Sequence, residues 1–343
     1  MIIVLRPGVT DKEIQHVIDR IKDLGLEVNV SRGIHRTVIG VIGEEDVLRL
    51  TPLEAMPGVE KVMPVLAPYK LASREFQLED TIIRVKDAQI GGGTFTVMAG
   101  PCAVESREML LEIAIAVKRA GATVLRGGAF KPRTSPYSFQ GLGEEGLKLL
   151  KEASERTGLP VATEVMDTRE VPLVAEYVDI LQIGARNMQN FSLLNEVGKT
   201  DKPIILKRGL SATVKELLMS AEYILSQGNH QVILCERGVK SFEDSVRFVL
   251  DISAIPNVKG ISHLPILVDP SHSTGRWDLV GPVSRAAVAV GADGLLVEVH
   301  NCPEKALSDG AQSLLPEKFR SMMDDLRRLA KVMNRTMARA SES

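Results

Sequence analysis

The sequence contains few cysteines, no excess of positive charge and no long apolar run. Three cysteines in 343 residues, Cys102, Cys235 and Cys302, are too few for a disulfide framework, and their odd number fits a reducing compartment. The net charge of -2 excludes a nucleic-acid-binding protein that relies on bulk positive charge. No apolar run approaches the roughly 18 residues that span a bilayer, and residues 1–5 lack the features of a signal peptide. These absences predict a soluble, cytoplasmic protein with no nucleic-acid or membrane partner.

The first 72 residues have the pattern of a small domain of their own. Thr10 and Glu13 form a capping box in front of apolar residues at helical spacing, and Gly25 follows that helix. Further strands are predicted at 26–30, 36–42 and 59–65, and the acidic residues 44–46 favour the start of a second short helix. With an opening strand before the first helix, the order is βαββαβ. This order predicts a ferredoxin-like domain at residues 1–72.

Residues 73–343 are predicted to alternate between strands and helices after a linker and a hairpin at 81–90. Eight βα units over about 250 residues are typical of an α/β fold of the (β/α)8 TIM-barrel type. The alternative is a doubly wound open sheet, which usually needs fewer strands, and no G-x-G-x-x-G opens a first helix. One closing helix is predicted at 316–338. The eight strands are predicted at 95–99, 123–126, 160–164, 179–183, 203–207, 231–236, 264–269 and 294–299.

Basic residues gather at the predicted carboxyl ends of these strands, where TIM barrels carry their active sites. The segment 125–135 combines three cations with two hydroxyls, and its two glycines let the backbone approach a ligand closely. A surface ion pair explains each cation singly, but so many cations at one rim would repel each other unless they met a polyanion. We therefore expect a substrate that carries both phosphate and carboxylate. The cations expected to converge on it are Arg126, Lys131, Arg186, Lys207 and Arg237.

A second group of residues has the chemistry of a metal site. Cys102 follows the first strand, His272 the seventh, Glu298 ends the eighth, and Asp309 lies in the loop after it. Strands one, seven and eight adjoin in a closed barrel, and a buried carboxylate such as Glu298 needs a partner or a metal. Thiolate, imidazole and carboxylates together suit one divalent ion such as Mn, Fe, Co or Zn. Taken alone, Cys102 also reads as a core cysteine and His272 as a hydrogen-bonded loop histidine.

Seven short motifs resemble those of the 3-deoxy-D-arabino-heptulosonate-7-phosphate (DAHP) synthase family. The resemblance spans the whole barrel, and the small N-terminal domain is similar to the ferredoxin-like, ACT-type regulatory extension of some type Iβ members. It implies condensation of phosphoenolpyruvate with erythrose 4-phosphate, the first committed step of the shikimate pathway. The motifs are Gly100-Pro-Cys102 with Glu105, Lys131-Pro-Arg-Thr-Ser135, Gly184-Ala-Arg186, Leu206-Lys-Arg-Gly209, Asp269-Pro-Ser-His272, Glu298-Val-His300 and Ser308-Asp-Gly310.

The resemblance also assigns roles to these positions. The family's metal ligands fall on Cys102, His272, Glu298 and Asp309, and the five cations named above fall on the phosphoenolpyruvate site. Cys102, His272 and Lys131 are the expected catalytic residues, although Lys131 and a metal-bound water are both open as the proton carrier. The phosphate of erythrose 4-phosphate is expected to meet four further residues. These are Arg133, Thr134, Ser135 and Arg276.

Two other functions fit the sequence less well. The sister enzyme that makes 3-deoxy-octulosonate 8-phosphate typically has Lys-Ala-Asn-Arg-Ser in the basic loop, whereas Pro132, Arg133 and Thr134 stand here and favour the four-carbon acceptor. A non-catalytic amino-acid sensor is disfavoured because all four candidate metal ligands are present. The resemblance further implies inhibition by tyrosine or phenylalanine at the N-terminal domain and a homotetramer. A purely structural role of that domain is the alternative, and chorismate mutase activity is not expected.

Overall fold

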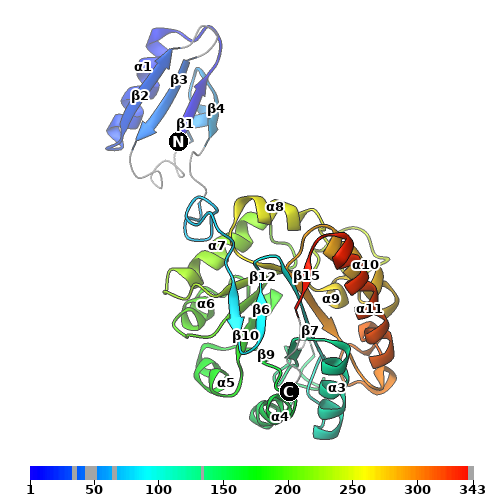
Figure 1. Cartoon of the computed structure of the whole chain (residues 1–343). Coiled ribbons are helices and arrows are strands. Elements are labelled where there is room, and N and C mark those ends of the chain that lie inside the picture. The colour runs from blue at the N-terminus through cyan, green and yellow to red at the C-terminus, as the bar shows by residue number, and fades with distance from the viewer. Residues whose placement is uncertain (33–36, 43–51, 64–67, 133–134, 339–343) are drawn as a thin grey trace. The chain divides into compact units, whose positions relative to one another are not determined.

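The computed structural model describes the chain except for residues 33–36, 43–51, 64–67, 133–134 and 339–343. The chain divides into two compact units, residues 1–70 and residues 71–343. Each unit has a sheet and a hydrophobic core of its own (Figure 1). In the described part of the chain, no helix is long and apolar enough to cross a membrane.

The N-terminal unit is a four-stranded antiparallel sheet with a helix packed on one face. Its strands β1 (Ile2–Leu5), β2 (Glu27–Arg32), β3 (Thr37–Ile42) and β4 (Val59–Met63) lie in the order β2-β3-β1-β4. Helix α1 (Asp11–Asp23) begins at the predicted capping box of Thr10 and Glu13. Its buried residues Ile14, Val17 and Ile21 pack against the sheet in one core. The ferredoxin-like fold is confirmed, while the predicted second helix falls on residues 43–51, outside the described residues.

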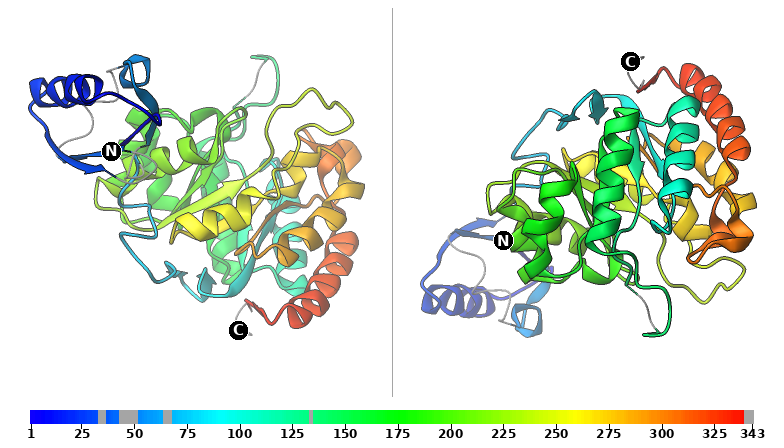
Figure 2. Two further views of the ribbon diagram at one scale, coloured as in Figure 1. Left: turned by 90° about the horizontal axis from the view of Figure 1, so that it is seen from above. Right: turned by 90° about the horizontal axis from the view of Figure 1, so that it is seen from below.

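The second unit is a closed barrel of eight parallel strands, as predicted. Each strand pairs with the next along the chain, and β14 pairs with β7 to close the ring. Helices surround the barrel, as two views at right angles to Figure 1 show (Figure 2). The strands are β7 (Thr94–Gly100), β8 (Val124–Arg126), β9 (Val161–Glu164), β10 (Ile180–Ile183), β11 (Ile204–Lys207), β12 (Val232–Glu236), β13 (Ile266–Val268) and β14 (Gly294–Glu298).

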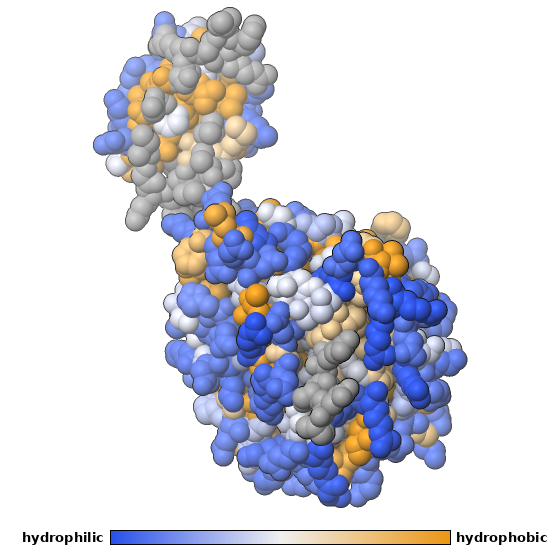
Figure 3. Space-filling view, viewed as in Figure 1, coloured by the Kyte–Doolittle hydropathy of each residue, from blue (hydrophilic) through white to orange (hydrophobic). Residues whose placement is uncertain are grey.

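The helices between these strands have the ends that the sequence predicts. Helix α7 begins at the capping box of Thr213 and Glu216, and α3 and α4 end at left-handed glycines, Gly121 and Gly158. On the side shown in Figure 3, the surface of this unit is mostly hydrophilic with scattered apolar side chains. The helices are α3 (Arg107–Ala120), α4 (Glu144–Thr157), α5 (Val171–Tyr177), α6 (Phe191–Gly198), α7 (Val214–Leu225), α8 (Ala254–Ile261), α9 (Pro270–Thr274), α10 (Trp277–Ala289) and α11 (Pro316–Val332).

A short hairpin fills one end of the barrel. Strands β5 (Ile83–Val85) and β6 (Ala88–Ile90) pair in antiparallel fashion, as predicted for 81–90. Their buried residues Ile83 and Ile90 join one hydrophobic cluster with lumen residues of the barrel strands, such as Ile205 and Leu296. Polar residues follow these lumen residues toward the carboxyl ends of the strands. The hairpin therefore leaves the carboxyl end of the barrel available for a site.

The closing helix is shorter than predicted. Helix α11 ends at Val332 instead of continuing to residue 338. Asn334 adopts a left-handed conformation with φ 53°, which interrupts a right-handed helix. Thr336 and Met337 then form a short strand, β15, which pairs with the amino-terminal end of β7. Pairing of β15 with the start of β7 thus overrides the helical pattern of the sequence.

Candidate active site

The candidate site continues the lumen face of the barrel strands. Residues two apart in a strand share a face. The residue two positions after a buried lumen residue therefore also faces the lumen, at the carboxyl end of the strand. Ile205 precedes Lys207 in this manner, whereas Arg208 points to the other face and pairs with Glu236 and Asp251 at 2.7 and 3.0 Å. The same spacing joins Val124 to Arg126, Ala162 to Glu164, Cys235 to Arg237, Leu267 to Asp269 and Leu296 to Glu298.

A polar pocket opens at this end and contains four of the five predicted cations, Lys131, Arg186, Lys207 and Arg237. The fifth, Arg126, is buried, and its Nη1 donates to the Pro101 carbonyl at 2.7 Å and to Glu298 Oε1 at 3.1 Å. The Nε of Arg126 has no hydrogen-bond partner among the described residues. The structure therefore brings four of the five cations together in one pocket and buries Arg126 beside Glu298.

Burial makes this pocket a poor place for unpaired positive charge. It lowers the pKa of the Arg237 guanidinium, which lies 4.0 Å from the centroid of the Phe248 ring. Among the described residues, Arg237 donates two long hydrogen bonds of 3.4 Å, to the carbonyls of Gly238 and His272. A bound anion would replace the hydration that this cation has lost.

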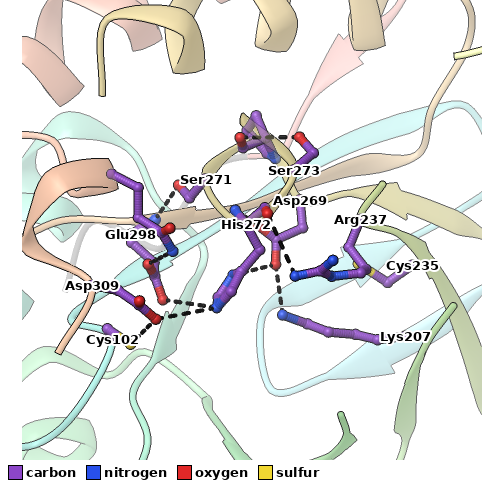
Figure 4. A network of polar contacts seen from close by, with 12 residues as sticks. Cys102, Lys207, Cys235, Arg237, Asp269, Ser271, His272, Ser273, Glu298 and Asp309 are labelled. Atoms are coloured by element: carbon purple, nitrogen blue, oxygen red, sulfur yellow. Dashed lines mark hydrogen bonds and ion pairs between the residues drawn. The ribbon is translucent and has the colours of Figure 1, made fainter. Parts of the chain in front are cut away.

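The four predicted metal ligands form one cluster beside the pocket (Figure 4). One ligand atom from each of Cys102, His272, Glu298 and Asp309 lies within 4.8 Å of all the others. Cys102 Sγ is 3.3 Å from Asp309 Oδ2, and His272 Nε2 is 3.4 Å from Glu298 Oε1 and 3.9 Å from Asp309 Oδ2. Protein ligands lie about 2.0–2.3 Å from such an ion, so donor atoms this close together could all reach a single ion.

The electrostatics of the cluster also suit a cation. Burial, and secondarily the charge of Glu298, raises the pKa of the Cys102 thiol to about 12. Burial alone would raise the pKa of the Asp309 carboxyl as well, but the charges of His272 and Arg247 and a hydrogen bond from Cys102 lower it to about 2. A bound divalent ion would displace the thiol proton and balance the two carboxylates.

Asp269 links this cluster to the cation pocket. Its Oδ2 accepts from His272 Nδ1 at 2.8 Å and from Lys207 Nζ at 2.6 Å, and its Oδ1 accepts from the His272 backbone N–H at 2.9 Å. Burial would raise the pKa of this carboxyl, but the charges of His272 and Lys207 hold it well below its usual range. With Nδ1 bound to Asp269, the imidazole presents Nε2 to the other three ligands. Carboxylates commonly orient metal-binding histidines in this way.

Of the four residues expected to meet the acceptor phosphate, the two that the structure describes do not line the pocket. Arg133 and Thr134 lie outside the described residues. Ser135 is exposed, and its Oγ accepts from the Tyr137 N–H at 3.3 Å. Arg276 pairs with Asp278 at 2.7 Å, and neither it nor Ser135 lines the pocket. Their role stays a prediction.

The structure adds residues that sequence analysis did not assign. Arg247 lines the pocket, and its Nη1 donates to Asp309 Oδ1 at 3.2 Å and to Gln312 Oε1 at 3.0 Å. Gln312 in turn donates to Glu298 Oε2 at 2.5 Å, and Ser308 Oγ lies 3.2 Å from Cys102 Sγ. Arg247 lies in a long loop without a motif, so no signal pointed to it. Asp269 stood in a recognised motif, but only its contacts reveal its function as a link.

Fold and site together define a (β/α)8-barrel protein with a cation-lined pocket beside a four-residue candidate metal centre. Residues 76–334 match the model of the DAHP synthetase I family, and residues 1–67 match the DAHP synthase ferredoxin-like domain. The chain therefore belongs to the DAHP synthetase I family. It is an enzyme of the DAHP synthase type, as predicted.

The relatives of this chain include a heptonate aldolase and, at lower identity, octulosonate aldolases. The phospho-2-dehydro-3-deoxyheptonate aldolase of Thermotoga maritima is 55% identical over 330 residues, which cover 96% of this chain and 98% of the relative. A crystal structure of the Thermotoga maritima enzyme covers 98% of both chains with 53% identity and a TM-score of 0.89. The 2-dehydro-3-deoxyphosphooctonate aldolase of Syntrophobacter fumaroxidans is 32% identical over 265 residues, which cover 72% of this chain and 91% of that relative.

Proposed function

We propose that this enzyme condenses phosphoenolpyruvate with erythrose 4-phosphate, in a reaction that requires one divalent metal ion. The observation that carries the proposal is that the cations and the candidate metal ligands meet in one pocket. His272 and Asp309 line it together with Lys131, Arg186 and Lys207. An anionic substrate held by the cations would therefore lie next to the ion.

Phosphoenolpyruvate matches the charge of the cation pocket. Its carboxylate carries one negative charge and its phosphate about 1.5 to 2, and guanidinium groups bind both in a bidentate manner. Arg186 is exposed at the mouth of the pocket, whereas Arg126, Lys207 and Arg237 are buried. We assign the donor site to these four residues and Lys131.

The metal would be held by Cys102, His272, Glu298 and Asp309. The mixture of thiolate, imidazole and carboxylate suits Mn, Fe, Co or Zn. When bound, the ion would supply Lewis-acid polarisation of the acceptor aldehyde. The closeness of the four donor atoms, which all lie within 4.8 Å of one another, supports this assignment.

The bonds change in a fixed order in this proposal. C3 of phosphoenolpyruvate forms the new bond to the aldehyde carbon, and the aldehyde oxygen takes up a proton. Water adds at C2, and the resulting hemiketal phosphate expels phosphate to leave a ketone. Burial lowers the pKa of Lys131, but the nearby Cys102 and Glu298 outweigh it and raise that pKa overall, so Lys131 is protonated and supplies positive charge beside the metal ligands. Lys131 and a metal-bound water are both candidates for the proton carrier.

The acceptor is assigned as the four-carbon sugar. Pro132 lines the pocket at the start of the segment that favours erythrose 4-phosphate over arabinose 5-phosphate. The octulosonate relative from Syntrophobacter fumaroxidans covers 72% of this chain, whereas the heptonate relative covers 96%. Mass spectrometry of the product from both acceptors tests the assignment. A seven-carbon sugar acid phosphate is expected, and faster formation of an eight-carbon product would overturn it.

We also assign a regulatory role to the N-terminal unit, with tyrosine or phenylalanine as the effector and a homotetramer as the assembly. A solved structure of a truncated form of the Thermotoga maritima enzyme covers 78% of this chain, which supports the view that such a barrel folds alone. The test compares the full chain with a chain that starts at Leu71, each assayed with every aromatic amino acid. Inhibition of the full chain alone is expected, and inhibition that survives truncation would exclude this role. Light scattering reports the assembly.

A further inference from the structure

Glu105 and His300 belong to two of the seven motifs, yet both lie outside the candidate site. Neither lines the cation pocket, and neither belongs to the four-ligand cluster. Both are inside the protein, because the side chain of His300 is 5% exposed and that of Glu105 is 11% exposed. Their side chains face each other, with His300 Nε2 3.6 Å from Glu105 Oε2.

The two residues connect the loops that carry two of the candidate metal ligands. Glu105 follows Cys102 by three positions in the loop after β7, and its Oε1 accepts from the Leu307 N–H at 2.9 Å. His300 begins the loop after β14, and its Nδ1 accepts from the Cys302 N–H at 3.0 Å. Glu105 therefore reaches across to the second loop, two residues before Asp309.

Asp309 lies in the middle of a loop that is tied together at its base. Its backbone is left-handed with φ 52°, a conformation that Asp adopts more often than most residues other than glycine. The base of its loop is closed by two hydrogen bonds of 2.9 Å, one from the His300 N–H to the Leu314 carbonyl and one from the Leu314 N–H to the Glu298 carbonyl. These bonds fix the ends of the loop but leave the middle, where Ser308 and Asp309 contact Cys102, to be held by other groups.

The tautomer of His300 follows from its contacts. Because Nδ1 accepts a hydrogen bond, the proton of the neutral ring lies on Nε2 and points toward the Glu105 carboxylate. The Nε2 atom has no hydrogen-bond partner among the described residues, and the Glu105 carboxylate, 3.6 Å away, is the acceptor toward which it lies.

We infer that Glu105 and His300 form a latch between the loops after β7 and β14, and that this latch sets the position of Asp309 against Cys102. They are positioning residues for the metal centre and touch neither substrate. This inference rests on the metal site of the proposed function. Substitution of either residue should weaken metal binding while leaving the phosphoenolpyruvate cations in place.

Two conservative variants isolate the latch. Glu105→Gln retains an oxygen for the Leu307 N–H but turns an NH2 group toward His300 Nε2. His300→Asn retains an acceptor for the Cys302 N–H, because an asparagine side chain commonly accepts from the backbone N–H two residues further on. The asparagine side chain is too short to reach Glu105. Glu108→Gln is the matched control, because Glu108 is exposed on the first turn of α3.

The measurement is a Co²⁺ titration of the metal-free full-length protein, followed by the thiolate-to-cobalt absorption band. We expect each latch variant to bind Co²⁺ at least about 10-fold more weakly, which is the usual effect of losing a residue that supports a metal ligand. The double variant should bind Co²⁺ no more weakly than the weaker of the two single variants. At saturating metal, the KM for phosphoenolpyruvate should stay within about two-fold of the parent.

The outcomes separate the latch from the proposed function. If the parent protein shows no cobalt band, the metal centre itself is wrong. If the parent binds Co²⁺ and a folded Glu105→Gln or His300→Asn variant binds it equally well, the latch is wrong and the metal centre stands. Additive losses in the double variant would also reject the latch, since the two side chains would then act independently.

Discussion

Replacement of Asp269 by asparagine should damage stability and metal binding together. The carboxylate of Asp269 receives three hydrogen bonds, from Lys207 Nζ at 2.6 Å, from His272 Nδ1 at 2.8 Å and from the His272 N–H at 2.9 Å. An asparagine offers one acceptor oxygen, so its NH2 group must face at least one of these donors. The buried Lys207 ammonium also loses its counter-charge.

The size of the effect follows from these contacts. Hydrogen bonds to charged groups contribute about 1.5–3 kcal/mol each, and breaking a buried ion pair costs about 3–5 kcal/mol. We expect Asp269→Asn to lower the free energy of unfolding by about 3 kcal/mol, allowing for partial rearrangement. Loss of the group that orients His272 should weaken metal binding by about 10- to 100-fold.

Urea denaturation and Co²⁺ titration of the same variant provide the two measurements. Trp277 is the single tryptophan of the chain, so its fluorescence reports on the barrel unit. Asp278→Asn is the control, because Asp278 forms an exposed ion pair with Arg276 and such pairs contribute about 0–1 kcal/mol. If Asp269→Asn unfolds at the same urea concentration as the parent and binds Co²⁺ equally well, the proposed link between pocket and cluster is wrong.

Three further predictions test other parts of the structure. Cys102→Ser should remove the cobalt–thiolate band and most turnover, measured on protein with unchanged circular dichroism, and an unchanged rate would show that the cysteine is structural. Arg186→Ala should raise the KM for phosphoenolpyruvate by about 10-fold or more, whereas Arg276→Ala should act on the erythrose 4-phosphate KM; the reverse pattern would contradict the assignment. Burial lowers the pKa of His263, so the unfolded chain binds a proton at this residue more readily than the folded chain does. Protonation of the unfolded chain therefore lowers the stability of the protein as the pH falls below about 6.5. Melting temperatures at pH 7.5 and 5.5 should therefore differ less in His263→Gln than in the parent, and an equal difference would refute this.

Much of the barrel was predictable because its signals are local and repeated. The eight apolar segments alternate with capped helices. Counting every second residue from a lumen residue such as Ile233 leads to the polar residue that faces the same way at the strand end. Parity also separates Lys207 from Arg208, which points to the opposite face. Most residues that line the cation pocket, and the four residues of the candidate metal cluster, could therefore be predicted from the sequence.

The remaining features depend on contacts between distant segments. Arg247 reaches Asp309 from a loop without periodicity, and Asp269 joins two groups that lie 62 and three residues away from it. The end of α11 could not be predicted either, because the pairing of β15 with β7 decides it. Such contacts leave no pattern along the chain.

A metal titration of the chelated, metal-free enzyme tests the central claim most directly. Phosphoenolpyruvate consumption in the presence of erythrose 4-phosphate is measured while Mn²⁺, Co²⁺ or Zn²⁺ is added stepwise. We predict negligible turnover without metal and a rise that saturates at one equivalent of ion per chain, with the ion lost in the Cys102→Ser variant. Undiminished condensation after chelation would contradict a metal centre formed by Cys102, His272, Glu298 and Asp309.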